Sequence, residues 1–206
     1  MISIIDYGAG NIESVRKALH YTGCECRVTA DKELINSSNG IILPGVGSFG
    51  DCVNQITASG LDVTIKENIV NGKPFLGICL GFQMLFSESE ESPGAEGLSV
   101  FGGKVVRFDE SLGNKIPHIG WNNIEFNEQC PLFTGLSQNS YVYFVHSYYV
   151  SAADSSIVSA VTEYGETFHS AVWSGNVFAT QFHPEKSGSV GITMLRNFTK
   201  ICKEEI

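Results

Sequence analysis

The first half of the chain alternates short apolar runs with segments of helical spacing. Apolar runs at 2–6, 24–30, 40–45 and 73–78 predict strands, and the segments at 11–23, 51–71 and 81–89 predict helices. Strands that alternate with helices in this way form βαβ units, whose parallel strands are covered by helices on both faces. The sequence therefore predicts an α/β protein of three layers built on a parallel central sheet.

The second half has a different pattern. Residues 100–182 carry β-branched and aromatic runs separated by Gly, Asn, Asp and Ser, which predict antiparallel strands and hairpins. A helix is predicted at 191–202, and the acidic stretch 87–97 is interpreted as a surface loop. We expect one domain over residues 1–206, a length sufficient for a sizeable core.

Composition excludes several classes of protein. The formal net charge of −9 argues against nucleic acid or an anionic membrane surface as the main partner. No signal peptide is visible, and no apolar run approaches the roughly 18 residues of a spanning helix. The six cysteines are irregularly spread and are interpreted as reduced thiols of a cytoplasmic protein. Cys24 and Cys26 have no matching ligand pair, so no metal site is expected.

Cys79 stands between two glycines at the end of a predicted strand, in the stretch FLGICLGFQ. The pattern Gly77-Ile78-Cys79-Leu80-Gly81 has the layout of a nucleophile elbow, with cysteine in place of serine. Small flanking residues suit a turn in which backbone segments approach closely, and a following helix favours the thiolate. An ordinary buried cysteine explains this stretch equally well, since unpaired cysteine is often buried.

A cysteine nucleophile requires a base and a group that orients the base. His183 ends an apolar strand two residues before Glu185, and side chains at i and i+2 of extended backbone share a side. The alternative is a His–Glu pair satisfied on the surface. Oxyanion donors are expected from the N–H of Leu80 and from the segment Pro44–Gly47, for which the alternative is a plain turn.

The three motifs GICLG, PGVG and HPE, in this arrangement, resemble the class I glutamine amidotransferases. DYGAGN (6–11), PHIGWN (117–122) and VHSYY (145–149) extend the resemblance over nearly the whole chain, toward glutaminase subunits that feed ammonia to a cyclase in histidine biosynthesis. The resemblance implies a flavodoxin-like three-layer fold with an antiparallel extension, and glutamine hydrolysis through a γ-glutamyl thioester. No metal or organic cofactor is implied.

The resemblance also assigns residues to roles. It implies Cys79 as nucleophile, His183 as base and acid, Glu185 as the orienting group, and Val46, Gly47 and Leu80 around the oxyanion. It implies that glutamine is bound by Gly47, Gln83, Glu91, Ser147 and Tyr148, and that a β/α-barrel cyclase contacts the chain near Asn11, His118 and Trp121.

Several alternatives stay open at the level of sequence. A paralogous glutaminase that supplies ammonia for amidation of surface sugars has the same chemistry. A partner-binding scaffold without activity is expected to lack part of the triad, and a thiol peptidase or isomerase does not account for PHIGWN. For PHIGWN itself, a tryptophan buried in an ordinary hairpin is the alternative to a partner contact.

Overall fold

A parallel sheet forms the centre of the protein. The structure is a computed structural model that describes residues 1–8 and 10–203. Its central strands lie in the order β2-β1-β3-β4-β12 and are all parallel. Their bounds are β1 Ile2–Ile5, β2 Cys26–Thr29, β3 Gly40–Gly45, β4 Phe75–Cys79 and β12 Val177–Thr180. The predicted parallel sheet is confirmed.

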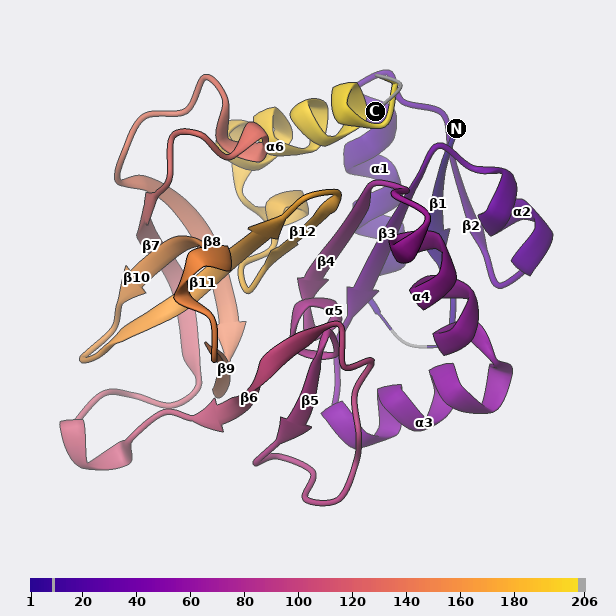
Figure 1. The fold of residues 1–206 in the computed structure, drawn as a ribbon. Helices are drawn as coiled ribbons and strands as arrows, with labels where there is room; N and C mark the ends of the chain where they lie inside the picture. Colours follow the sequence, from indigo (N-terminus) through magenta and orange to yellow (C-terminus); the bar gives the residue numbers. More distant parts are fainter. Residues whose placement is uncertain (9, 204–206) are drawn as a thin grey trace.

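Helices cover both faces of this sheet (Figure 1). One face packs against α1 (Ile12–Tyr21) and α6 (Gly188–Ile201), and the other against α2 (Lys32–Ser37), α3 (Phe49–Ser59) and α4 (Leu61–Val70). Every residue of β1, β3, β4 and β12 is buried as a result. Strands covered on both sides are apolar throughout, which explains why the sequence shows continuous runs there.

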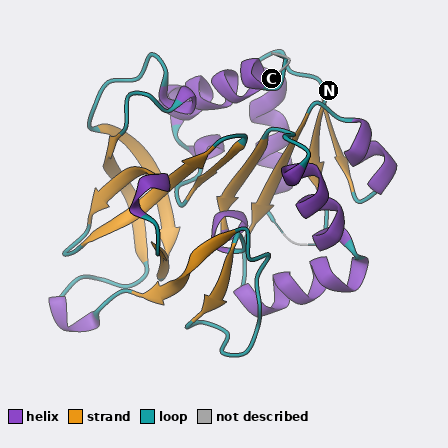
Figure 2. Ribbon diagram, viewed as in Figure 1, coloured by secondary structure: helices purple, strands orange, loops and turns teal. Residues whose placement is uncertain are grey.

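An antiparallel extension continues the sheet beyond β12 (Figure 2). Strand β12 pairs antiparallel with β11, and the order continues through β10 and β7 to β8, while β9 pairs with β11 and β6. The bounds are β6 Phe101–Arg107, β7 His118–Phe126, β8 Ser140–His146, β9 Tyr148–Ala152, β10 Val158–Glu163 and β11 Thr167–Ser174. Short 3₁₀ helices lie at Glu110–Leu112, Pro131–Phe133, Ser155–Ile157 and Pro184–Lys186. The predicted extension is confirmed.

The helix predicted at 81–89 is wrong beyond its first turn. Helix α5 spans only Leu80–Gln83, and Phe86–Ser89 forms strand β5, which pairs parallel with β6. Pairing with a distant strand determines the conformation of this segment. Phe86 lies opposite Phe101 of β6, and the ring of Phe86 is fully buried. Apolar spacing alone does not distinguish a short buried strand from a helix.

Two smaller differences concern helices. The helix predicted at 51–71 is two helices, because Gly60 takes a left-handed conformation with φ of 66° between them. Helix α2 was not predicted; Asp31 caps it by accepting hydrogen bonds from the backbone N–H groups of Glu33 and Leu34. Within the described residues, no helix has the length and apolar character that crossing a bilayer requires.

Candidate active site

Cys79 is the last residue of β4 and precedes α5 directly. Its backbone has φ of 55° and ψ of −108°, a region that non-glycine residues rarely adopt. Such strain costs on the order of 1–3 kcal/mol and persists only where the surroundings enforce it. The tight turn expected from GICLG is therefore present, and its strain distinguishes Cys79 from an ordinary buried cysteine.

Glycines allow the backbone around this turn to pack closely. A Cβ on Gly77 would lie 2.7 Å from the carbonyl oxygen of Gly81, and a Cβ on Gly81 would collide with the carbonyl oxygen of Leu43 on β3. A Cβ on Gly45 would lie 2.7 Å from the backbone nitrogen of Gly81. Strands β3 and β4 and the start of α5 are thus in backbone contact at Cys79.

This packing predicts a large effect of one methyl group. Gly81→Ala is expected to lower the free energy of unfolding by about 3 kcal/mol, because the new Cβ meets backbone that cannot move aside. Chemical denaturation of the variant measures the loss. Gly102→Ala is the matched control, since its Cβ would make ordinary contact with Ala153 at 3.7 Å. Equal stabilities for the two variants would contradict the predicted clash.

His183 and Glu185 form a buried pair next to Cys79. The Nδ1–H of His183 donates to Oε1 of Glu185 over 2.8 Å, and the two side chains are only 2% and 1% exposed. The alternative of a surface pair is therefore wrong. Within the described residues, His183 Nε2 is buried without a hydrogen-bond partner. This nitrogen is the one available for proton transfer.

The backbone at the pair differs from the extended run that was expected. Pro184–Lys186 forms a single 3₁₀ turn with Pro184 at its first position, where a missing N–H costs nothing. The N–H of His183 donates to the carbonyl of Tyr143 on β8, and the hydroxyl of Ser187 donates to the carbonyl of His183. The antiparallel extension thus fixes where His183 stands.

The surroundings of His183 shift its pKa strongly. Burial by itself lowers the pKa of this imidazole, but its interactions with Cys79 and Glu185 outweigh burial and raise the pKa to about 10. At neutral pH both ring nitrogens are therefore protonated and the imidazole is cationic, next to Cys79 and Glu185. Helix α5 is a single turn, so the helix dipole contributes less here than the long helix predicted from the sequence would.

The segment Pro44–Gly47 is anchored on both sides of Gly45. The hydroxyl of Tyr7 donates to the carbonyl of Pro44 over 3.0 Å, and the thiol of Cys52 donates to the carbonyl of Val46 over 3.4 Å. Gly47 has φ of 102°, which a residue with a side chain rarely adopts. Leu80 begins α5, so its N–H has no acceptor within the helix. Both expected sources of oxyanion donors lie beside Cys79.

One cavity of about 410 Å³ contains nearly all the predicted catalytic and substrate-binding residues. Glu185 lies behind His183 rather than on the wall. Glu91 reaches the wall while its Oε2 accepts from the N–H of Phe49 over 2.8 Å. The predicted residues on the wall are Val46, Gly47, Cys79, Leu80, Gln83, Glu91, Ser147, Tyr148 and His183.

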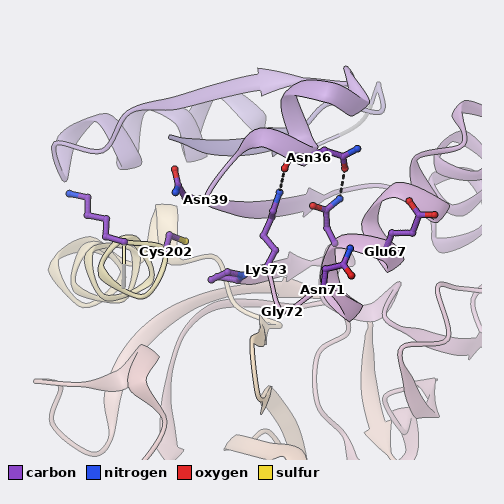
Figure 3. Close-up of a pocket in the computed structure, with 10 residues that line it drawn as sticks. Asn36, Asn39, Glu67, Asn71, Gly72, Lys73 and Cys202 are labelled. Atoms are coloured by element: carbon purple, nitrogen blue, oxygen red, sulfur yellow. Dashed lines mark hydrogen bonds between the residues drawn. The ribbon is translucent and has the colours of Figure 1, made fainter. Parts of the chain in front are cut away.

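A second cavity, of about 450 Å³, lies at the opposite end of the central strands, where β3 and β4 begin (Figure 3). Its Lys73 donates to the backbone carbonyls of Ile35 and Asn36, and Asn68 donates to the side chain of Asn36. Ligands of open α/β sheets bind at the carboxyl ends of the strands, where Cys79 lies. The Cys79 cavity is therefore the candidate active site.

The residues predicted at a partner contact have different surroundings. Trp121 is 55% exposed, with its ring edge-on to Tyr143, so the alternative of a buried tryptophan is wrong. Asn11 is half-buried at the start of α1. His118 is only 3% exposed because its ring stacks on Tyr164 and Phe144, so its side chain is not available to a partner surface.

Three polar residues near Cys79 were not predicted from the sequence. Gln181 donates to the sulfur of Cys79 over 3.7 Å, and His146 and Lys186 line the cavity. Gln181 has a signal in the sequence, since it stands two positions before His183 at the end of an apolar strand. His146 and Lys186 have no such signal, because nothing in the sequence distinguishes them from other polar residues near the ends of strands.

Comparison with known proteins identifies the class to which this fold and site belong. The model of the family "Glutamine amidotransferase class-I" matches residues 3–202, and the chain belongs to this family. A solved glutamine amidotransferase aligns with a TM-score of 0.77 at 20% identity, covering 98% of this chain and 99% of that one. A chain of the PurLQS structure from Thermotoga maritima aligns with a TM-score of 0.75 at 20% identity, covering 97% of each. At 20% identity, these two structures support the fold of this chain and not its activity.

Curated relatives narrow the class further. The imidazole glycerol phosphate synthase subunit HisH of Syntrophotalea carbinolica is 49% identical over 203 residues, covering 96% of this chain and 98% of the relative. The protein of the same name from Methanothermobacter thermautotrophicus is 46% identical, covering 98% and 100%. That from Geobacillus kaustophilus is 48% identical, covering 98% and 97%. The resemblance to one kind of glutaminase subunit is thereby confirmed.

Proposed function

We propose that this protein is the glutaminase subunit of an imidazole glycerol phosphate synthase and that Cys79, His183 and Glu185 are its catalytic triad. One observation carries the assignment of the triad: a strained cysteine and a buried His–Glu pair meet at one cavity. Cysteine, a protonated histidine and a carboxylate form the arrangement that acyl transfer by a thiolate requires. Residues 1–206 act as one domain in this proposal, in the cytoplasm.

The reaction follows from the positions of these groups. The Cys79 thiolate attacks the side-chain amide carbon of glutamine, and N–H groups of Leu80 and of the Val46–Gly47 segment hold the oxyanion. His183 gives its Nε2 proton to the amide nitrogen as the C–N bond breaks, so ammonia leaves and a γ-glutamyl thioester remains. Water then attacks the thioester, His183 takes the proton, and glutamate departs as the thiolate is restored.

Glutamine is held by its α-amino and α-carboxylate groups in the same cavity. Gln83, Glu91, Ser147 and Tyr148 line it, and the acidic side chain of Glu91 suits an ammonium group. Gln83 uses both amide hydrogens within the protein, on the carbonyl of Tyr148 and on Oε1 of Gln181, which leaves its own Oε1 as an acceptor toward the ligand.

The ammonia is delivered to a cyclase partner of β/α-barrel fold. That partner converts a phosphoribosyl formimino carboxamide ribonucleotide to imidazole glycerol phosphate and AICAR in histidine biosynthesis. The names of the relatives support this recipient over the amidation of surface sugars. Exposed apolar side chains on β7, Ile119 and Trp121, support a contact on this hairpin beside the cavity.

Dependence on the partner tests this assignment. Mixed with the cyclase and its nucleotide, the chain is expected to release glutamate at least about tenfold faster than alone, since the Val46 peptide is proposed to reorient before the oxyanion donors are complete. Coupled detection of glutamate measures both rates. Equal rates for the isolated chain and the complex would contradict the reorientation, and no glutamate from the complex would contradict the proposed function itself.

A further inference from the structure

Gln181 is a buried amide in direct contact with the nucleophile. Its side chain is fully buried at the end of β12, and its Nε2 lies 3.7 Å from the sulfur of Cys79. Its backbone N–H donates to the carbonyl of Ser170 on β11, which fixes the point from which the side chain extends. An N–H group aimed at sulfur interacts more strongly with a thiolate than with a thiol.

The direction of this hydrogen bond follows from a neighbouring carbonyl. The Tyr148 carbonyl can only accept, so the atom of Gln83 that lies 3.0 Å from it is the amide nitrogen. The second hydrogen of that nitrogen requires an acceptor, which Oε1 of Gln181 supplies at 3.0 Å. The remaining atom of the Gln181 amide, facing Cys79, is therefore Nε2. If the Gln83 amide were turned the other way, its oxygen would face the Tyr148 carbonyl, and if the Gln181 amide were turned, its nitrogen would face the nitrogen of Gln83.

Two buried histidines continue the same chain of hydrogen bonds. The Nδ1–H of His146 donates to the Tyr148 carbonyl over 2.8 Å, which leaves its Nε2 to accept from Nδ1–H of His118 over 3.0 Å. Burial lowers the pKa of His146 to about 3 and that of His118 to about 4, so each ring holds a single proton. The tautomers are thus determined, and the rings brace the carbonyl on which the Gln83 amide depends.

We infer that Gln181 is a thiolate-stabilising residue, oriented by Gln83 and by the histidines behind the Tyr148 carbonyl. Its amide N–H favours the charged form of Cys79 and holds the sulfur in place on the cavity wall. This inference rests on the proposed function, because it assumes that the thiolate of Cys79 is the reactive form. Neither Gln181 nor the two histidines takes part in the proton transfers of the reaction.

Other groups also act on the sulfur and have to be held constant in a test. His183 interacts with it from the turn after β12, with Glu185 behind the ring, and Tyr7, which follows β1, interacts with it electrostatically. Glu91 and Lys186 line the same cavity. A change at Gln181 leaves all five residues in place. A shift in the pH dependence of the reactivity of Cys79 can therefore be attributed to the lost N–H group.

Alkylation of Cys79 by iodoacetamide between pH 5 and pH 10, followed in the full chain by peptide-resolved mass spectrometry, tests the inference. In Gln181→Leu, the midpoint of the pH profile is expected to move up by about one pH unit, and alkylation on the acid side to slow about tenfold, since one unit is a factor of ten in the thiolate fraction. The isosteric Gln181→Glu replaces the donor by an acceptor, and a larger shift in the same direction is expected.

Asn197→Leu is the matched control. Asn197 is also a buried amide, donating to the carbonyls of Leu132 and Thr134 far from Cys79, so its loss is expected to lower stability without moving the alkylation midpoint. An unchanged midpoint in either folded Gln181 variant, or an equal shift in Asn197→Leu, would overturn the inference. Alkylation needs no glutamine, so a chain that shows the shift but releases no glutamate with the cyclase leaves this inference intact and refutes the proposed function.

Discussion

Cys79→Gly is expected to abolish glutamate release and to stabilise the protein at the same time. Loss of the nucleophile is expected to reduce kcat by at least about three orders of magnitude. Glycine adopts the backbone conformation of residue 79, φ of 55° and ψ of −108°, without the strain that cysteine bears there. Glycine also gives the unfolded chain more conformational entropy, which offsets part of the relieved strain. We expect a net gain of about 1 kcal/mol in the free energy of unfolding, which corresponds to a rise of about 2–4 °C in Tm.

Thermal unfolding and glutamate release, measured on the same preparations with the cyclase partner present for activity, check both halves of this prediction. Cys79→Ser is the control, since serine keeps the strained backbone while removing the thiolate. It is expected to lose activity without gaining stability. A glycine variant no more stable than the serine variant would show that residue 79 stores no strain, whereas full activity in either would remove Cys79 from the mechanism.

Glu185→Gln is expected to lower kcat by about three to four orders of magnitude with little change in KM. The carboxylate accepts from Nδ1–H of His183 and so places the other ring nitrogen toward the nucleophile. An amide at position 185 can present its own N–H to Nδ1 instead, which favours the wrong tautomer, and such a change in a triad typically costs about 10⁴ in kcat. Steady-state glutaminase kinetics of the complex give both constants.

The same variant is expected to change the dependence of stability on pH. In the folded protein the pKa of His183 is about 10, above the ordinary value of 6.5. A raised pKa means that the folded state binds the proton more tightly, so this stabilisation is fully present below pH 6.5 and is lost as pH rises toward 10. Glu185→Gln removes one cause of the raised pKa and is expected to flatten this fall.

Chemical denaturation at pH 6.5 and pH 9 measures this effect. Glu13→Gln is a suitable control, because Glu13 pairs with Arg16 on the exposed face of α1, where such pairs contribute little. It is expected to leave the difference between the two pH values unchanged. The same fall in stability in Glu185→Gln as in the parent chain would mean that the carboxylate does not hold the proton on His183.

The sequence predicted well wherever local pattern is sufficient. The apolar runs of β1, β3 and β4 are continuous because both faces of the central sheet are covered, and such runs are visible without a structure. The glycines at 77 and 81 mark the tight turn at Cys79 through a steric requirement that is also local. His183 and Glu185 are two positions apart, so their pairing was accessible, although the 3₁₀ turn that forms it was not.

The failures occur where distant segments decide the outcome. Phe86–Ser89 is a strand because β6 lies beside it, and His118 is buried because Phe144 of β8 and Tyr164, just after β10, stack on it. Trp121, on the same strand as His118, is exposed. Apolar and aromatic spacing in a hairpin does not reveal which face receives a covering layer, and this is why neither side chain could be placed from the sequence.

The sequence by itself determined the class of fold, and it indicated the tight turn at Cys79 and the pairing of His183 with Glu185, because each depends on residues close together in the chain. Only the tertiary structure decided that these groups share one cavity and that Tyr7 and Cys52 hold the Pro44–Gly47 segment. It also decided that the Gln181 amide faces the sulfur, since that orientation depends on a carbonyl at Tyr148 and an amide at Gln83, far away in sequence. Hydrogen bonds between distant strands have no periodic signature, so the stretch FLGICLGFQ marks the tight turn at Cys79 but not the distant groups that contact its sulfur.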